Sequence, residues 1–306
     1  MPDNKMSRRA WSKMMLAGSL GTVLPSMLSF SQPGKPYTFT LGIQTYSMRD
    51  RSREDAIQMM KELGITSAEV WAGHIEPREY QWTRFSTEDE VKAKIAALEK
   101  WRQKANMKAF EKIREQFAAA GIKVQAYSFN MNDNTSDHDV DLAFRIARAL
   151  GTDTLTTSAT ITSMKRIDSY AQQYKIKVGM HNHSNVGRPN DFSTPESFEK
   201  AMEGCSHYTC INLDIGHFVA ANLDPVAFLR NNHGKVVCLH IKDRKKDQGD
   251  NVPFGEGDTP IKAVLELVRN NQWNIPANIE YEYNGADTQT EINRCMQYCK
   301  DIIAAK

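Results

Sequence analysis

Short apolar runs alternate with amphipathic segments along most of this chain. The apolar runs, which we predict to be strands, cover residues 38–47, 66–73, 122–131, 152–160, 176–185, 209–217, 235–243 and 277–283. The amphipathic segments, which we predict to be helices, cover 53–64, 90–120, 141–151, 163–174, 194–204, the residues after 224, 258–271 and the residues after 289. About eight such pairs predict an α/β fold, a single (β/α)8 TIM barrel. A doubly wound open sheet is the alternative, but no glycine-rich phosphate turn follows the first strand.

Several residues support the predicted boundaries of these elements. Gly64 is placed to end the first helix, and Thr194 begins a capping box. Asp224 caps the helix that Pro225 opens. The connection 74–120 is the one oversized link, and we expect it to form a rim over the barrel mouth.

The first 33 residues are expected to lie outside the fold. Arg8 and Arg9 precede an apolar stretch that is short and rich in glycine and serine, too short to span a bilayer. This segment resembles a twin-arginine export signal, with Trp11 where such signals usually carry phenylalanine. We therefore predict an export signal at 1–33, a catalytic barrel at 34–306 and a periplasmic location, with no membrane attachment once the signal is removed.

Composition narrows the class of partner. The chain is 41% hydrophobic and 25% charged, with a net charge of +2, which does not favour a nucleic-acid partner. We expect the basic run from Lys242 to Lys246 to be a solvated loop after a strand. The five cysteines show no zinc-ribbon spacing, and we expect them to be free thiols. The sequence leaves open whether the chain forms a homo-oligomer.

Candidate chemistry gathers at the ends of the predicted strands. In a barrel the carboxyl ends of all strands meet at one face, where active sites form. Polar residues stand near the ends of strands one, two and five to eight: Tyr46, Glu69, His181, His183, Asp214, His217, His240, Asp243, Glu280 and Glu282. Because alternate residues share a face, Met180, Ile241, Ile279 and Tyr281 should face the helices. Histidine and carboxylate on four consecutive strands predict a metal site.

The chain resembles the xylose isomerase-like TIM barrels, which include sugar-phosphate isomerases and epimerases. The motifs that carry the resemblance are LGIQTYS, SAEVW, LDIGH, LHIKD, FGEG and IEYEY, in that order. The resemblance implies one divalent metal held by Asp214, His240 and Glu280, with Glu282 as a competitor for Glu280. The first ligand of the family, commonly Glu in Glu-Asn-His, is His181 here. Histidine among the ligands favours Zn, Mn, Co or Fe over Mg.

The same resemblance suggests roles for the other strand-end residues. Glu280, Glu282 and His183 are the candidate acid–base catalysts. The candidates for contact with a carbohydrate substrate are Tyr46, Glu69, Trp71, His217, Lys242 and Asp243. Epimerases of this family use two glutamates on opposite sides of the substrate, and one of them is replaced here.

This replacement favours removal of a single proton. We expect a metal-dependent carbohydrate enzyme that takes a proton next to a ketone, a lyase that β-eliminates 3-keto-glycosides, because some exported relatives look like such lyases. An isomerase or epimerase of an unphosphorylated keto-sugar is the second hypothesis, and a non-catalytic sugar-binding barrel is the third. A DNA-repair endonuclease would need more ligands on strands two to four than Glu69.

Overall fold

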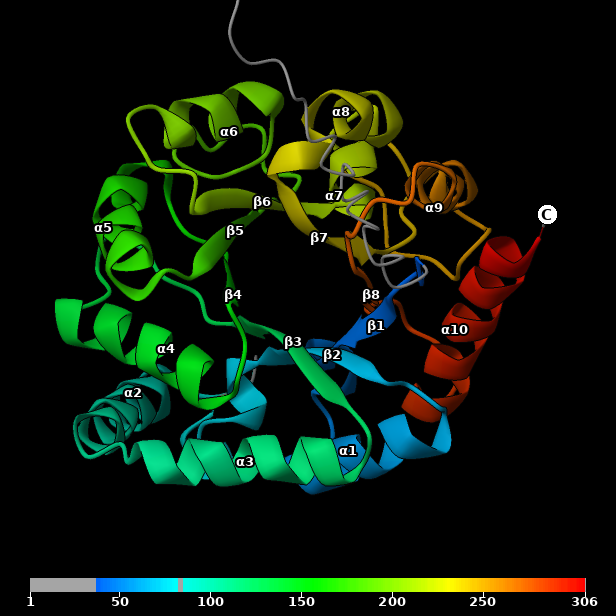
Figure 1. Ribbon diagram of the computed structural model, residues 1–306. Coiled ribbons are helices and arrows are strands. Elements are labelled where there is room, and N and C mark those ends of the chain that lie inside the picture. Colours follow the sequence, from blue (N-terminus) through cyan, green and yellow to red (C-terminus); the bar gives the residue numbers. More distant parts are fainter. Residues whose placement is uncertain (1–36, 82–84, 306) are drawn as a thin grey trace, which may run out of the picture. The chain divides into compact units, whose positions relative to one another are not determined.

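Eight parallel strands close into a barrel in the chain from Thr38 onward (Figure 1). The computed structural model describes residues 37–81 and 85–305, so the predicted export signal lies outside the described residues. Each strand pairs with its sequence neighbours, and β8 pairs with β1. The strands are β1 Leu41–Gln44, β2 Ser67–Trp71, β3 Lys123–Ser128, β4 Thr154–Thr157, β5 Lys177–His181, β6 Thr209–Asp214, β7 Val236–Ile241 and β8 Ala277–Ile279. The predicted (β/α)8 TIM barrel is confirmed.

Helices surround this barrel (Figure 1). They are α1 Arg53–Glu62, α2 Glu88–Gln103, α3 Met107–Ala119, α4 Asp137–Ala149, α5 Met164–Tyr174, α6 Pro195–Met202, α7 Ile215–Ala220, α8 Pro225–Asn232, α9 Ile261–Asn270 and α10 Thr288–Ala304. The capping box at Thr194 is present, with Ser197 as its partner, and Asp224 caps α8 as predicted.

The sequence prediction was wrong at two places that matter for the site. The single helix expected over 90–120 is two helices, because Asn106 caps a new one, its side chain accepting a hydrogen bond from the Lys108 backbone. The strand expected to reach His217 ends at Asp214, whose carboxylate accepts the His217 amide at 2.7 Å and starts α7. His217 therefore lies in a short helix above the strand end.

The apolar core lies between the strands and the helices, whereas the centre of the barrel contains polar side chains. Met180, Ile241 and Ile279 are fully buried in the hydrophobic layer, as their alternation predicts. Glu69 lies inside the barrel with no exposed surface, and its carboxylate accepts hydrogen bonds from Gln44 at 2.8 Å and from Asn278 at 2.9 Å. Burial of a carboxylate requires such partners, and Glu69 in turn supports the site above it.

Among residues 37–81 and 85–305, no helix is both long and apolar enough to cross a membrane.

Candidate active site

The four residues predicted as metal ligands come together at the carboxyl ends of β5 to β8. His181, Asp214, His240 and Glu280 each offer one ligand atom, and these atoms lie within 4.8 Å of one another. All four side chains are buried. Strand geometry causes the convergence, since His181 ends β5 and Asp214 ends β6, while His240 lies opposite Asp214 in the pairing of β6 with β7.

This cluster fits a divalent metal by its chemistry. Within the described part of the chain, His181 Nδ1 is buried and has no hydrogen-bond partner, whereas Asp214 Oδ2 forms an ion pair with the ammonium of Lys242 at 3.2 Å. Buried polar atoms are normally satisfied, so the unpaired ring nitrogen of His181 points to a missing partner. Two imidazoles and two carboxylates are a ligand set that suits Zn, Mn, Co or Fe.

Glu69 fixes the orientation of His240 from below. Its carboxylate lies 2.9 Å from His240 Nε2, and Glu280 lies 3.0 Å from His240 Nδ1. Burial by itself would lower the pKa of His240, but Glu69 and Glu280 raise it well above its usual value. With Nε2–H donating to Glu69, Nδ1 is directed to the ligand cluster. This is the carboxylate–histidine arrangement that orients metal ligands in proteins.

Lys242 places a positive charge among the carboxylates of the site. Its Nζ lies 2.9 Å from Glu280 and 3.2 Å from Asp214, and it also pairs with Glu282. Burial would lower the pKa of Lys242, but Asp214, Glu280 and Glu282 raise it, so the side chain is an ammonium. Lys242 is 2% exposed, so the expectation of a solvated run was wrong at its first residue, whereas Lys245 and Lys246 are exposed as expected.

The two buried carboxylates beside Lys242 respond in opposite directions. Burial raises the pKa of Asp214 to about 6 despite the nearby ammonium. Burial also acts on Glu280, but Lys242 and His240 outweigh it and hold the pKa of Glu280 well below its usual value. Asp214 is therefore the first of the pair to take up a proton as the pH falls below neutral, whereas Glu280 stays ionised.

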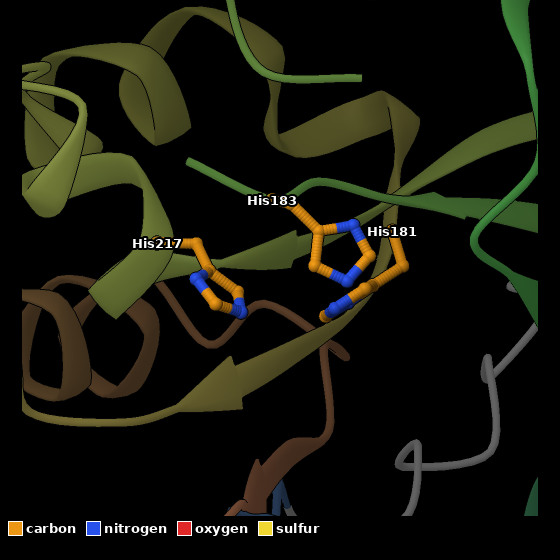
Figure 2. A group of neighbouring side chains, drawn as sticks. All are labelled: His181, His183 and His217. Atoms are coloured by element: carbon orange, nitrogen blue, oxygen red, sulfur yellow. The ribbon is translucent and has the colours of Figure 1, made fainter. Parts of the chain in front are cut away.

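Three histidines form a second group at the same cavity: His181, His183 and His217 (Figure 2). The rings of His183 and His217 are 5.1 Å apart, and those of His181 and His183 are 5.0 Å apart. Burial lowers the pKa of His183 and, well below its usual value, that of His217, with Lys242 adding to both shifts. Both rings are therefore neutral at pH 7.

Arg244 sets the tautomer of His217. Arg244 Nη1 lies 2.7 Å from His217 Nδ1, and a guanidinium can only donate. Nδ1 is therefore the acceptor, which leaves the proton of the neutral ring on Nε2. His217 Nε2 lies 3.2 Å from Lys242 Nζ, so these two hydrogen-bond donors face the same part of the cavity.

A cavity of about 250 Å³ opens over these groups, and its walls differ in charge. The β1–β4 side contributes groups that are uncharged at neutral pH: Gln44, Tyr46, Trp71, Ser128, Asn130 and Ser158. The β5–β8 side contributes histidines and charged groups: His181, His183, His217, His240, Lys242, Glu280 and Glu282. Tyr46 belongs to the first set because burial raises the pKa of its phenol.

Two predicted substrate contacts do not line this cavity. Glu69 lies beneath it against His240. Asp243 is 1% exposed and accepts the backbone amides of Gly255 and Gly257 at 2.8 and 3.0 Å, so it holds the FGEG turn. A Cβ on Gly257 would lie 1.9 Å from Asp243 Oδ1, which explains the glycine there. We therefore expect neither carboxylate to contact a substrate.

The sequence predicted Tyr46 and Trp71 on the uncharged wall but not Arg244 or the other uncharged lining residues, which are Gln44, Ser128, Asn130 and Ser158. Arg244 was grouped with the solvated basic run, but the Gly249 carbonyl accepts from its Nη2 at 2.6 Å and turns the side chain inward. Asn130 and Ser158 follow β3 and β4, and strand-end position was the only signal that could have found them.

Comparison with known proteins places the chain in a family. The profile of the family described as xylose isomerase-like TIM barrel matches residues 57–301. L-ribulose-5-phosphate 3-epimerase UlaE from Salmonella typhi is 34% identical over 95 residues, 29% of this chain and 33% of that enzyme. The chain thus matches about a third of the length of that relative.

Solved structures agree on the fold. A zinc-bound IOLI protein superposes with a TM-score of 0.63 at 14% identity, covering 87% of this chain and 98% of that one. The probable 3-DHS dehydratase AsbF from Bacillus anthracis gives 0.62 at 15% identity, covering 86% and 99%. At such identities the likeness concerns the fold alone. From the matched profile, the closed barrel and the strand-end cluster together, this chain belongs to the xylose isomerase-like TIM barrel family.

Proposed function

We propose that this protein is a metal-dependent carbohydrate enzyme that removes a proton next to a sugar ketone and then β-eliminates the aglycone of a 3-keto-glycoside. The observation that carries the proposal is the charge division of the cavity. The histidines, the carboxylates and the lysine that line the cavity, which include its candidate metal ligands and bases, come from one side. The uncharged opposite wall suits the hydroxyls and apolar faces of a sugar.

His181, Asp214, His240 and Glu280 would hold the metal. When bound there, a divalent metal supplies Lewis-acid polarisation of the ketone and stabilises negative charge on its oxygen. Glu69 keeps Nδ1 of His240 directed at that position.

His183 is the base that this arrangement favours. It lines the cavity outside the four-ligand cluster, and its ring is neutral at pH 7. Glu282 also lines the cavity, but it is held by the ammonium of Lys242. A paired carboxylate is a weaker proton acceptor than a neutral imidazole in the same cavity.

Lys242 and His217 provide donors for the negative charge that develops as the proton leaves. Lys242 Nζ and His217 Nε2–H are 3.2 Å apart, and two donors so close repel each other unless an acceptor lies between them. An enolate oxygen is such an acceptor. Fixed donors of this kind act as an oxyanion hole, and removal of one typically costs about 10²–10³-fold in rate.

The bonds balance without any further reactant. The C2–H bond breaks and its proton goes to His183, a C1=C2 double bond forms, and the C1–O bond breaks. The aglycone leaves as an alcohol after taking a proton, and the His183 imidazolium formed in the first step can return the proton that it took. A periplasmic location, which we also propose, agrees with an unphosphorylated substrate.

An isomerase or epimerase of an unphosphorylated keto-sugar is the second candidate, and the match to a sugar-phosphate epimerase favours it. Such an enzyme needs a second base on the opposite face of the substrate. His183 and Glu282 follow different strands, β5 and β8, and could serve as that pair. The replacement of a ligand glutamate by His181 supports elimination instead.

Product analysis in deuterated water separates these functions. The metal-loaded protein is incubated with a 3-keto-glucoside and, separately, with a free keto-hexose, and products are followed by NMR and mass spectrometry. We expect release of the aglycone together with an unsaturated keto-sugar. Deuterium incorporation without cleavage would instead establish the epimerase reading. A metal-bound protein that turns over neither sugar would support a non-catalytic binding barrel.

A further inference from the structure

The turn formed by residues 244–249, in the connection between β7 and α9, contacts active-site residues from outside the cavity. It closes on itself, because the Gly249 carbonyl accepts hydrogen bonds from Arg244 Nη2 at 2.6 Å and from Arg244 Nε at 3.1 Å. Arg244 and Gln248 are the two residues through which this turn reaches the site, and neither lines the cavity. The proposed reaction gives the 244–249 turn no role.

The backbone of this turn has an unfavourable conformation that specific contacts hold in place. Asp247 and Gln248 have φ angles of 55° and 59°, in the left-handed region that residues other than glycine rarely adopt. The Asp247 amide donates to Asn222 Oδ1 at 3.1 Å, and the Gln248 amide donates to the Ala220 carbonyl at 2.8 Å. These contacts fix the turn against the end of α7. Strained backbone of this kind persists where the surrounding structure determines it, and it often lies at functional sites.

Arg244 and Lys242 face opposite nitrogens of the His217 ring. Arg244 Nη1 lies 2.7 Å from Nδ1, and Lys242 Nζ lies 3.2 Å from Nε2. Both cationic groups can only donate, whereas a neutral imidazole has a single acceptor nitrogen, so the ring can accept from only one of them. The shorter contact is the one with Arg244. Without Arg244, Lys242 would select the opposite tautomer, in which Nε2 accepts and Nδ1 carries the proton.

The same turn also holds the segment that carries His183. Ser184 follows His183 in the chain and is 6% exposed. Its hydroxyl accepts a hydrogen bond from Arg244 Nη1 at 3.1 Å, and its carbonyl accepts one from Gln248 Nε2 at 2.7 Å. The rings of His183 and His217 lie side by side, 5.1 Å apart (Figure 2). One turn therefore contacts both the ring of His217 and the residue next to His183.

We propose that the 244–249 turn positions the two histidines of the proposed reaction: Arg244 keeps Nε2–H of His217 directed into the cavity, and Arg244 and Gln248 together hold His183 beside it. Arg244 and Gln248 are thus positioning residues, which act through His217 and Ser184. The inference rests on the proposed function for the roles of His183 and His217. Displacement of a catalytic group by about 1 Å can cost about 10²-fold in rate, so contacts of this kind matter for turnover.

The tautomer of His217 tests this proposal without any turnover. The full-length, zinc-loaded protein is labelled with ¹⁵N-histidine, and the ring nitrogens are observed by NMR at pH 7, with His217→Gln used to assign the signals. We expect the Nε2–H tautomer in wild type and the Nδ1–H tautomer in Arg244→Ala. Gln248→Ala should keep the wild-type tautomer because Arg244 remains, and so should the control Arg230→Ala, since Arg230 is exposed on α8. An Nδ1–H tautomer in wild type, or an unchanged one in Arg244→Ala, overturns the proposal.

Steady-state kinetics on a 3-keto-glucoside test the consequence for the reaction. Arg244→Ala should lower kcat about 10²-fold with KM changed less, and guanidinium ion, at concentrations too low to unfold the protein, should restore part of the loss. Gln248→Ala should lower kcat by a smaller factor. A wild-type kcat in Arg244→Ala, or a change in KM alone, overturns the positioning role. If wild type turns over no 3-keto-glucoside, the proposed function fails, whereas the tautomers still decide whether Arg244 orients His217.

Discussion

The two halves of the barrel mouth differ in what they offer a bound molecule. Lining residues from β1–β4 are uncharged at neutral pH, and those from β5–β8 are histidines, a lysine and glutamates. The first half can therefore hold hydroxyls and apolar faces without taking part in proton transfer. The second half holds the four candidate metal ligands, the other histidines, Lys242 and Glu282. The proposed function therefore assigns recognition to one half and chemistry to the other, and substitutions in the two halves should have effects of different kinds.

The largest effect is expected from a ligand in the β5–β8 half. His240→Gln should remove most of the bound metal and lower turnover by about 10³-fold or more, since metal polarisation is worth several kcal/mol. Metal content by mass spectrometry and aglycone release are the measurements. His233→Gln is the matched control, because His233 is exposed and stacks on Trp273. Full metal content in His240→Gln would remove His240 from the ligand set.

His74 follows β2, is buried and does not line the active-site cavity, so its titration should act on stability. Burial lowers its pKa to about 4, so the unfolded chain takes up a proton near pH 6.5 while the folded protein does not. Stability should fall as pH drops from 6.5 to 4, by up to about 3 kcal/mol. Denaturation midpoints of wild type and His74→Gln across this range test it. A variant with an unchanged pH slope would contradict the assignment.

Glu69 comes from β2 but acts on the β5–β8 half through His240. Glu69→Gln should weaken metal affinity about 10–100-fold, as loss of an orienting carboxylate typically does. Competition with a chelator measures it, and Glu62→Gln on the exposed face of α1 is the control. An unchanged affinity would mean that the His240 ring is oriented without Glu69.

The smallest effect is expected in the β1–β4 half itself. Asn130→Ala should raise KM about threefold to tenfold with kcat changed less, because a lost neutral hydrogen bond costs about 0.5–1.5 kcal/mol in substrate and transition state alike. Steady-state kinetics on the 3-keto-glucoside provide the values. A fall in kcat at constant KM would place Asn130 in the chemical step and break the division between the halves.

The positions of polar residues at strand ends predicted the four-residue ligand cluster, but they did not predict that Glu69 supports His240 from inside the barrel. His181, Asp214, His240 and Glu280 were found because the carboxyl ends of parallel strands must meet. Glu69 was expected at the cavity, but β2 continues two residues beyond it to Trp71, so its side chain lies inside the barrel beneath the mouth. The end of a buried apolar strand is hard to place from the sequence to within two residues.

Long-range loop contacts set the other limit on prediction. Arg244 reaches His217 because Gly249, five residues further on, holds its guanidinium. The break at Asn106 was hidden by amphipathic patterns that continue on both sides of it. At Arg244 a tertiary contact with Gly249 determined the structure, and at Asn106 a helix cap did. The local pattern of polar and apolar residues specifies neither.

In the proposed reaction a group of the β5–β8 half, His183, takes the proton next to the ketone. The most direct test is the rate of deuterium loss from a C2-deuterated 3-keto-glucoside, followed by NMR, with wild type, His183→Asn and Glu282→Gln proteins of equal metal content. We predict that His183→Asn loses deuterium release and aglycone release together, by about 10²–10⁴-fold, while Glu282→Gln keeps most of both. Wild-type rates in His183→Asn would contradict the account.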